Sequence, residues 1–72
     1  MLELNEAVAE TDDLAKVRQI GEENARSIAR TSQEVQDAFA KGDLEAARVA
    51  TAKLKYFATL ARNVNTRLGY PS

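Results

Sequence analysis

Cysteine and histidine are both absent from the 72 residues of this chain. Without them there are no disulfide bridges, no thiolate nucleophile, no imidazole base and none of the usual zinc ligands. A catalytic site built only from carboxylates is a remote alternative, because a domain this small scarcely encloses a pocket around paired acids. We therefore expect a chain that is not an enzyme and that carries no metal and no cofactor.

A clear excess of one charge is missing as well. The chain has 10 basic and 11 acidic residues, for a net charge of -1. Nucleic-acid binding is disfavoured, since it depends on a basic surface that displaces counterions from phosphates. No run of about 18 apolar residues is present, and the start lacks the basic and apolar segments of a signal peptide. These absences leave a soluble domain that binds another protein, with no nucleic acid and no membrane as partners.

Alternating strand patterns are missing, and apolar residues instead follow helical three–four spacing in three segments. The spacing predicts helices over residues 1–10, 13–41 and 44–68. Thr11, Asp12 and Asp13 are N-cap candidates for the second helix and Asp43 for the third, while Gly42 suits the left-handed end of a helix. The expected fold is all-α: a three-helix bundle in one domain, residues 1–72, whose short first helix packs on a long antiparallel hairpin. The apolar stripes of the two long helices are predicted to be Leu14, Val17, Gly21, Ala25, Ile28, Ser32, Val35 and Phe39, and then Leu44, Ala47, Thr51, Leu54, Phe57, Ala61, Val64 and Leu68.

Charge is unevenly distributed along the chain. Residues 1–13 hold five acids and no base, whereas the remainder holds ten bases and six acids. Glu3, Glu6, Glu10 and Asp13 are spaced by three, four and three, which predicts one acidic stripe along a helix. This stripe is either a solvated face or a docking strip for a basic partner, with Leu2 as its apolar anchor. A calcium site is a weaker alternative, because no loop with alternating oxygen ligands is present.

A second stripe, beside the predicted core of the third helix, contains Lys53, Tyr56, Leu60 and Asn63. Tyr56 either covers the edge of the core with its hydroxyl in water or carries binding energy at an interface. The basic residues of this helix are spread around it. They are therefore expected to shield the small core rather than to bind phosphate.

Three stretches together resemble a known family: LELNEAVAE over residues 2–10, FAKGDLEAA over residues 39–47 and KLKYF over residues 53–57. They are similar to the C-terminal three-helix domain of HscB, a family of J-protein co-chaperones for iron–sulfur cluster assembly. The resemblance implies a domain that binds an IscU-like scaffold protein and helps bring it to a heat-shock ATPase. It also implies a location in the bacterial cytoplasm or the mitochondrial matrix.

The same resemblance assigns candidate site residues. Leu2, Glu3 and Glu6 match the scaffold-binding first helix of the family, Glu10 extends that match, and Tyr56 matches an aromatic residue of the same interface. The family stimulates its ATPase with a His-Pro-Asp motif in a J-domain, and this chain has no histidine. It therefore corresponds to the C-terminal half alone. The rival hypothesis is a structural helical hairpin that self-associates as a homodimer through its Ala-rich stripes.

Overall fold

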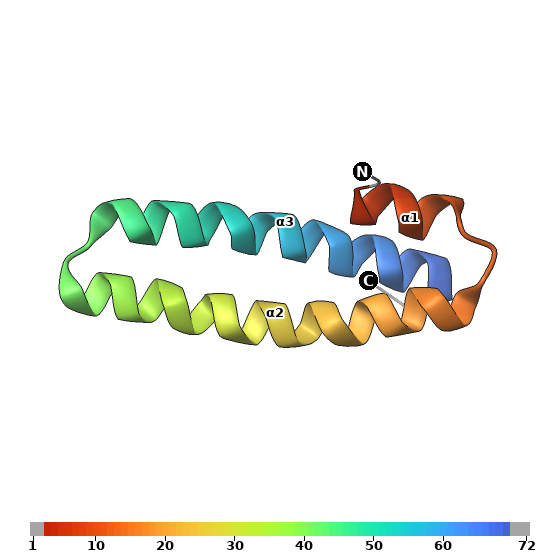
Figure 1. The fold of residues 1–72 in the computed structure, drawn as a ribbon, viewed down its shortest axis with the longest axis horizontal. Helices are drawn as coiled ribbons and strands as arrows, with labels where there is room; N and C mark the ends of the chain where they lie inside the picture. The colour runs from red at the N-terminus through yellow and green to blue at the C-terminus, as the bar shows by residue number, and fades with distance from the viewer. Residues whose placement is uncertain (1–2, 70–72) are drawn as a thin grey trace.

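Three helices make up the protein in the computed structural model, which describes residues 3–69. They are α1 (Leu4–Glu10), α2 (Leu14–Lys41) and α3 (Leu44–Leu68). Helices α2 and α3 form a long antiparallel hairpin, and α1 lies along the end of the hairpin where α2 begins (Figure 1). Its contacts are mainly with α3. The predicted all-α architecture is confirmed, and within residues 3–69 no helix is long and apolar enough to cross a membrane.

Local capping chemistry explains where the long helices begin and end. The Asp13 carboxylate accepts hydrogen bonds from the backbone N–H groups of the first turn of α2, at 3.0 and 3.4 Å. Gly42 ends α2 with φ 72°, a left-handed conformation that carries little strain only in glycine. The Asp43 backbone N–H donates to the carbonyl of Ala38, while its carboxylate accepts from the N–H of Ala46. Asp43 thus closes one helix and opens the next.

The apolar core is small and lies under α1. It consists of Val8, Val17, Leu60 and Val64, with Ile20 and Leu68 packed against it at its edge. Towards the hairpin turn the buried positions hold smaller side chains, such as Thr31, Ala38, Ala47 and Ala50. Because apolar stabilisation scales with buried area, most of it is concentrated at the end of the hairpin that α1 covers.

The buried positions of α2 differ from the predicted stripe. Val17, Asn24, Thr31 and Ala38 are buried at a regular spacing of seven residues, which is the period of helices that coil around one another. The prediction followed apolarity instead, and it was wrong for several residues that the structure leaves exposed. These are Leu14, Ala25, Phe39, Leu44 and Thr51.

Leu60 was also misplaced by the sequence pattern. It was expected beside the core of α3 and is instead completely buried within it. The reason is the added helix: α1 brings Val8 into the same cluster, so the core extends round α3 beyond the side that faces α2. The periodicity of a single helix gives no direct indication of this second contact.

Gly21 marks a close approach between the long helices. A Cβ atom built at this position would lie 2.8 Å from Cγ1 of Val64, a distance at which one of the two groups must move. Val64 is buried and has a branched, stiff side chain. The absence of a side chain at Gly21 therefore sets the separation of α2 and α3 at this point.

We expect the substitution Gly21→Ala to lower the thermal midpoint, although alanine is the better helix former by about 1 kcal/mol. The clash with Val64 is the cause, so the same substitution made in a Val64→Ala background should be neutral or stabilising. Thermal unfolding of the two single variants and the double variant measures this coupling. A similar effect of G21A in both backgrounds would contradict the steric explanation.

Asn24 offers a second test of the packing. Its Nδ2 donates a hydrogen bond of 2.8 Å to the carbonyl oxygen of Phe57, while its buried Oδ1 has no partner among residues 3–69. We expect Asn24→Leu to maintain or raise the free energy of unfolding, and Asn24→Asp to lower it by about 1–3 kcal/mol, because aspartate lacks the donor and buries a charge. Urea denaturation near neutral pH checks both. A large loss of stability in N24L would show that this single hydrogen bond dominates.

Candidate functional site

Helix α1 is attached to α3 by polar contacts along its length. At its start, the Glu3 carboxylate lies close enough to the Tyr56 hydroxyl to shift the pKa of both groups. Two residues on, Oδ1 of Asn5 accepts a hydrogen bond of 2.7 Å from Nδ2 of Asn63. After its last turn, the guanidinium of Arg67 donates to the carbonyl oxygen of Thr11. These contacts show that α1 runs parallel to α3, with its start near Tyr56.

Tyr56 is half-buried at the junction of the two helices. Its ring meets the edge of the Phe57 ring at a centroid distance of 5.5 Å. Its hydroxyl lies near the Glu3 carboxylate and the backbone of Leu4, and both affect its pKa. The sequence left open whether this residue covers the core edge or stands free, and the structure shows a tyrosine whose polar end is engaged by the first turn of α1.

The contact between Glu3 and Tyr56 changes the acidity of both groups. The hydrogen bond from the Tyr56 hydroxyl is the main cause that lowers the pKa of Glu3, and the N–H of Asn5 adds to it. The hydrogen bond with Glu3 is also the main cause that raises the pKa of Tyr56, followed by desolvation. Both shifts favour an ionised Glu3 beside a protonated Tyr56.

Of the other predicted acids, Glu6 and Glu10 lie on α1, whereas Asp13 lies beyond its end. Glu6 and Glu10 are both exposed, and Glu10 borders a hollow formed with Lys16 and Ile20 of α2. Asp13 was expected on the same stripe, and this expectation was wrong. Helix α1 ends at Glu10, and the Asp13 carboxylate caps α2 instead. Leu2, the predicted apolar anchor, lies outside the described residues.

Two exposed apolar residues near Tyr56 were not singled out from the sequence. Leu4 is 43% exposed, and its backbone meets the Tyr56 hydroxyl. Val49 is 48% exposed and stands seven residues before Tyr56, so the two occupy the same side of α3. The seven-residue interval was the signal that could have identified Val49. The candidate surface, defined as Glu3, Leu4, Glu6, Glu10, Val49 and Tyr56, combines an apolar middle with an acidic border.

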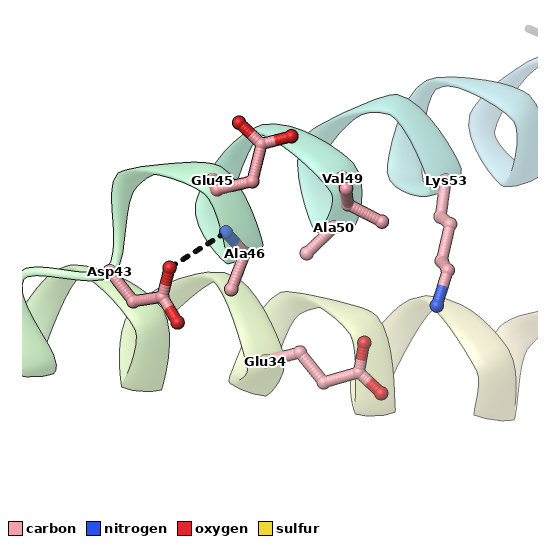
Figure 2. A pocket seen from close by; sticks show the side chains of 7 residues that line it. All are labelled: Glu34, Asp43, Glu45, Ala46, Val49, Ala50 and Lys53. Carbon is pink, nitrogen blue, oxygen red and sulfur yellow. Dashed lines mark hydrogen bonds between the residues drawn. The ribbon is translucent and has the colours of Figure 1, made fainter.

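Beyond Val49 this surface continues into a hollow of about 500 Å³ near the hairpin turn. Figure 2 shows Glu34 of α2 and Lys53 of α3 on its two sides, with the Asp43–Ala46 capping bond at one end. The hollow is wide open to solvent, and among residues 3–69 no group of three or more acids lies close enough together to hold a metal ion. Its geometry suits contact with another macromolecule better than chemistry on a small substrate.

The Glu3–Tyr56 contact makes a pH-dependent prediction. Because the pKa of Glu3 is lowered in the folded state, its contribution to stability is present above the usual value of 4.5 and is lost as the pH falls through the lowered value. We expect the substitution Tyr56→Phe to raise the pKa of Glu3 towards 4.5, and Glu3→Gln to lower that of Tyr56 towards 10.0. Carbon-detected NMR titration of the Glu3 carboxyl and the Tyr56 phenol checks both. Unchanged midpoints would contradict the contact.

The sequence of this chain is similar to that of a known domain family. The model of the HSCB C-terminal oligomerisation domain family matches residues 1–65, which is most of the chain. No curated protein and no solved structure matches it. The matched segment contains α1, α2 and nearly all of α3, and it includes Glu3, Glu6, Glu10 and Tyr56. This chain belongs to the family of HscB C-terminal domains, the helical co-chaperone domains of iron–sulfur cluster biogenesis.

Proposed function

We propose that this domain binds an IscU-like iron–sulfur scaffold protein and helps deliver it to a heat-shock ATPase. The observation that carries the proposal is the contact between Glu3 and Tyr56, which holds the acidic helix beside the aromatic residue. Membership of the HscB C-terminal family supports a role in iron–sulfur cluster biogenesis. The domain acts as a binding module and not as an enzyme, in the bacterial cytoplasm or the mitochondrial matrix.

The candidate surface divides into two functional parts. Leu4, Val49 and the ring of Tyr56 form an apolar middle, which is where interfaces concentrate their binding energy. Glu6 and Glu10 are exposed carboxylates on the border, where charges mainly raise the rate of association with an oppositely charged partner. We therefore expect the scaffold to present a basic rim around an apolar patch. Leu2 is proposed to extend the apolar middle.

The role towards the ATPase is indirect. The 72 residues contain no histidine, so they carry no His-Pro-Asp motif. Stimulation of the ATPase then requires a J-domain, and this domain contributes delivery of the bound scaffold. In this proposal, the helical domain binds the scaffold protein and a J-domain activates the ATPase.

Scaffold binding is tested by titrating an IscU-like scaffold into the domain and measuring affinity by calorimetry. We expect Tyr56→Ala to weaken binding at least tenfold, which corresponds to about 1.4 kcal/mol, because it removes the aromatic centre of the surface. Tyr56→Phe should have a smaller effect, because it keeps the ring and loses only the hydroxyl. Wild-type affinity in Y56A would rule out this surface as the binding site.

The acidic border is tested by kinetics. We expect the double substitution Glu6→Gln and Glu10→Gln to slow association and to flatten its dependence on salt, with a smaller effect on dissociation. Glu23→Gln is the control, because Glu23 is also an exposed acid but lies on α2. Stopped-flow measurements at several ionic strengths separate the two rates. If the control slows association as much, the effect comes from the overall charge of the domain and not from Glu6 and Glu10.

Self-association is a second candidate function. The description of the matching family names oligomerisation, and the exposed apolar side chains of the hairpin give a self-associating chain a surface to use. This role is compatible with scaffold binding wherever the two use different faces of the molecule. The proposal is then a domain that binds its scaffold and a second copy of itself.

A further inference from the structure

A chain of hydrogen bonds joins the first turn of α1 to α3 through the side chain of Asn5. Its Nδ2 donates to Oε1 of Glu3 at 2.8 Å, and its backbone N–H donates to the same oxygen at 3.1 Å. Its Oδ1 accepts from Nδ2 of Asn63 at 2.7 Å. An ionised carboxylate only accepts hydrogen bonds, so Glu3 fixes which end of the Asn5 amide faces it. The oxygen of that amide therefore faces Asn63, which must supply a donor.

Asn63 and Tyr56 hold the start of α1 from two places on α3. They are seven residues apart, which is close to two full turns, so both lie on the same side of the helix. The Tyr56 hydroxyl lies next to Glu3, whereas Asn63 reaches Glu3 only through Asn5. Asn5 and Asn63 are half-buried, while Glu3 is exposed. Two less accessible residues thus orient a carboxylate that a partner can reach.

Little else keeps α1 in place. Within Leu4–Glu10, Val8 is the one buried residue, and a helix of seven residues is not stable in water by itself. Beyond the far end of the helix, the guanidinium of Arg67 donates to the carbonyl oxygen of Thr11. With a single apolar anchor, docking of α1 depends on its polar contacts. Losing one of them shifts the balance between docked and undocked molecules.

Resting on the scaffold binding proposed above, we propose that Asn5 and Asn63 are positioning residues that control the affinity of the candidate surface. They keep the start of α1 docked and turn the Glu3 carboxylate towards Tyr56. Only molecules with α1 docked present Leu4, the acidic border and Tyr56 as one surface. The measured affinity is therefore the affinity of the docked form multiplied by the fraction of molecules that is docked.

The hydrogen-bond requirements of Asn5 identify the change that breaks this arrangement. In Asn63→Asp a carboxylate faces the Asn5 oxygen, and neither orientation of the amide then satisfies both of its neighbours. Adding Asn5→Arg supplies donors to both carboxylates and restores the net charge. Asn65→Asp is the matched control, because Asn65 is also a half-buried asparagine of α3 but borders a hollow lined by residues of α2 and α3.

Calorimetry with an IscU-like scaffold tests the effect on affinity. We expect N63D to weaken scaffold binding at least fivefold, because the docked fraction falls by the same factor. The double variant N5R/N63D should bind within twofold of the wild type, and N65D should bind like the wild type. Recovery in the double variant distinguishes positioning from general damage to α3, since its second substitution lies on α1.

Amide hydrogen exchange on the free domain tests docking without the scaffold. The amides of Ala7 and Thr11 have hydrogen bonds that exist only while α1 is helical. We expect both to lose most of their protection in N63D and to regain it in N5R/N63D. The amide of Asp43, which donates to Ala38 at the hairpin turn, should keep its protection in every variant.

Asn5→Ala tests the same contact from the α1 side and leaves the sequence of the hairpin unchanged. It removes both side-chain hydrogen bonds of Asn5, so scaffold binding should weaken and the α1 amides should exchange faster. The pKa of Glu3 should also rise towards 4.5 in an NMR titration, because the Asn5 side chain is one of the groups that lower it.

The two measurements separate the possible failures. Protected α1 amides in both N63D and N5A would overturn the positioning role and leave the proposed function standing. Unprotected α1 amides together with wild-type affinity would overturn the control of affinity by docking. A wild-type domain that does not bind the scaffold would overturn the proposed function and the control of affinity with it, whatever the exchange rates.

Discussion

Docking of α1 on α3 is the interaction on which the rest of the structure depends. A helix of seven residues is too short to be stable in water, so it exists only because α3 holds it. Val8 joins the core on one side, while Glu3, Asn5 and Thr11 are held by side chains of α3. Without this docking, Leu60 would lose its cover and the acidic residues would have no fixed position relative to Tyr56.

Because α1 docks at one end of the hairpin, the core is larger at that end than at the turn. At the α1 end three helices share a core of valine and leucine, whereas towards the turn only α2 and α3 remain (Figure 1). There the contact is made by Thr31, Ala38, Ala47 and Ala50, which bury little area each. Local stability follows buried apolar contacts, so the turn end is the part of the hairpin that opens more easily. It is also the part that exposes Phe39 and Leu44, which a contact with another chain would cover.

Much of this fold could be predicted from the sequence, because local chemistry determines where its helices begin and end. Asp13, Gly42 and Asp43 act through hydrogen bonds and backbone conformation within a few residues. Asp13 was one of three N-cap candidates, and the roles of Gly42 and Asp43 were predicted correctly. The buried side of α2 was not, because burial depends on how two helices coil around each other. A polar residue such as Asn24 is buried there because its amide donates a hydrogen bond to a carbonyl of the facing helix.

For the candidate surface, the sequence indicated the residue types and could not reveal their arrangement. It identified Glu3 and Tyr56 separately, whereas their contact joins residues more than 50 positions apart. It also placed Asp13 with the acids of α1, because the three–four spacing was followed past Glu10, where the first helix had itself been predicted to end. Val49 was overlooked for the opposite reason, since it lies on α3 and becomes part of this surface only once α1 is docked.

The contact between Glu3 and Tyr56 also has a consequence for the proposed recognition. A cationic side chain that paired with Glu3 would compete with the Tyr56 hydroxyl for the same carboxylate. Binding of such a partner and docking of the start of α1 would then be thermodynamically linked, and the affinity would include the free energy of exchanging one contact for the other.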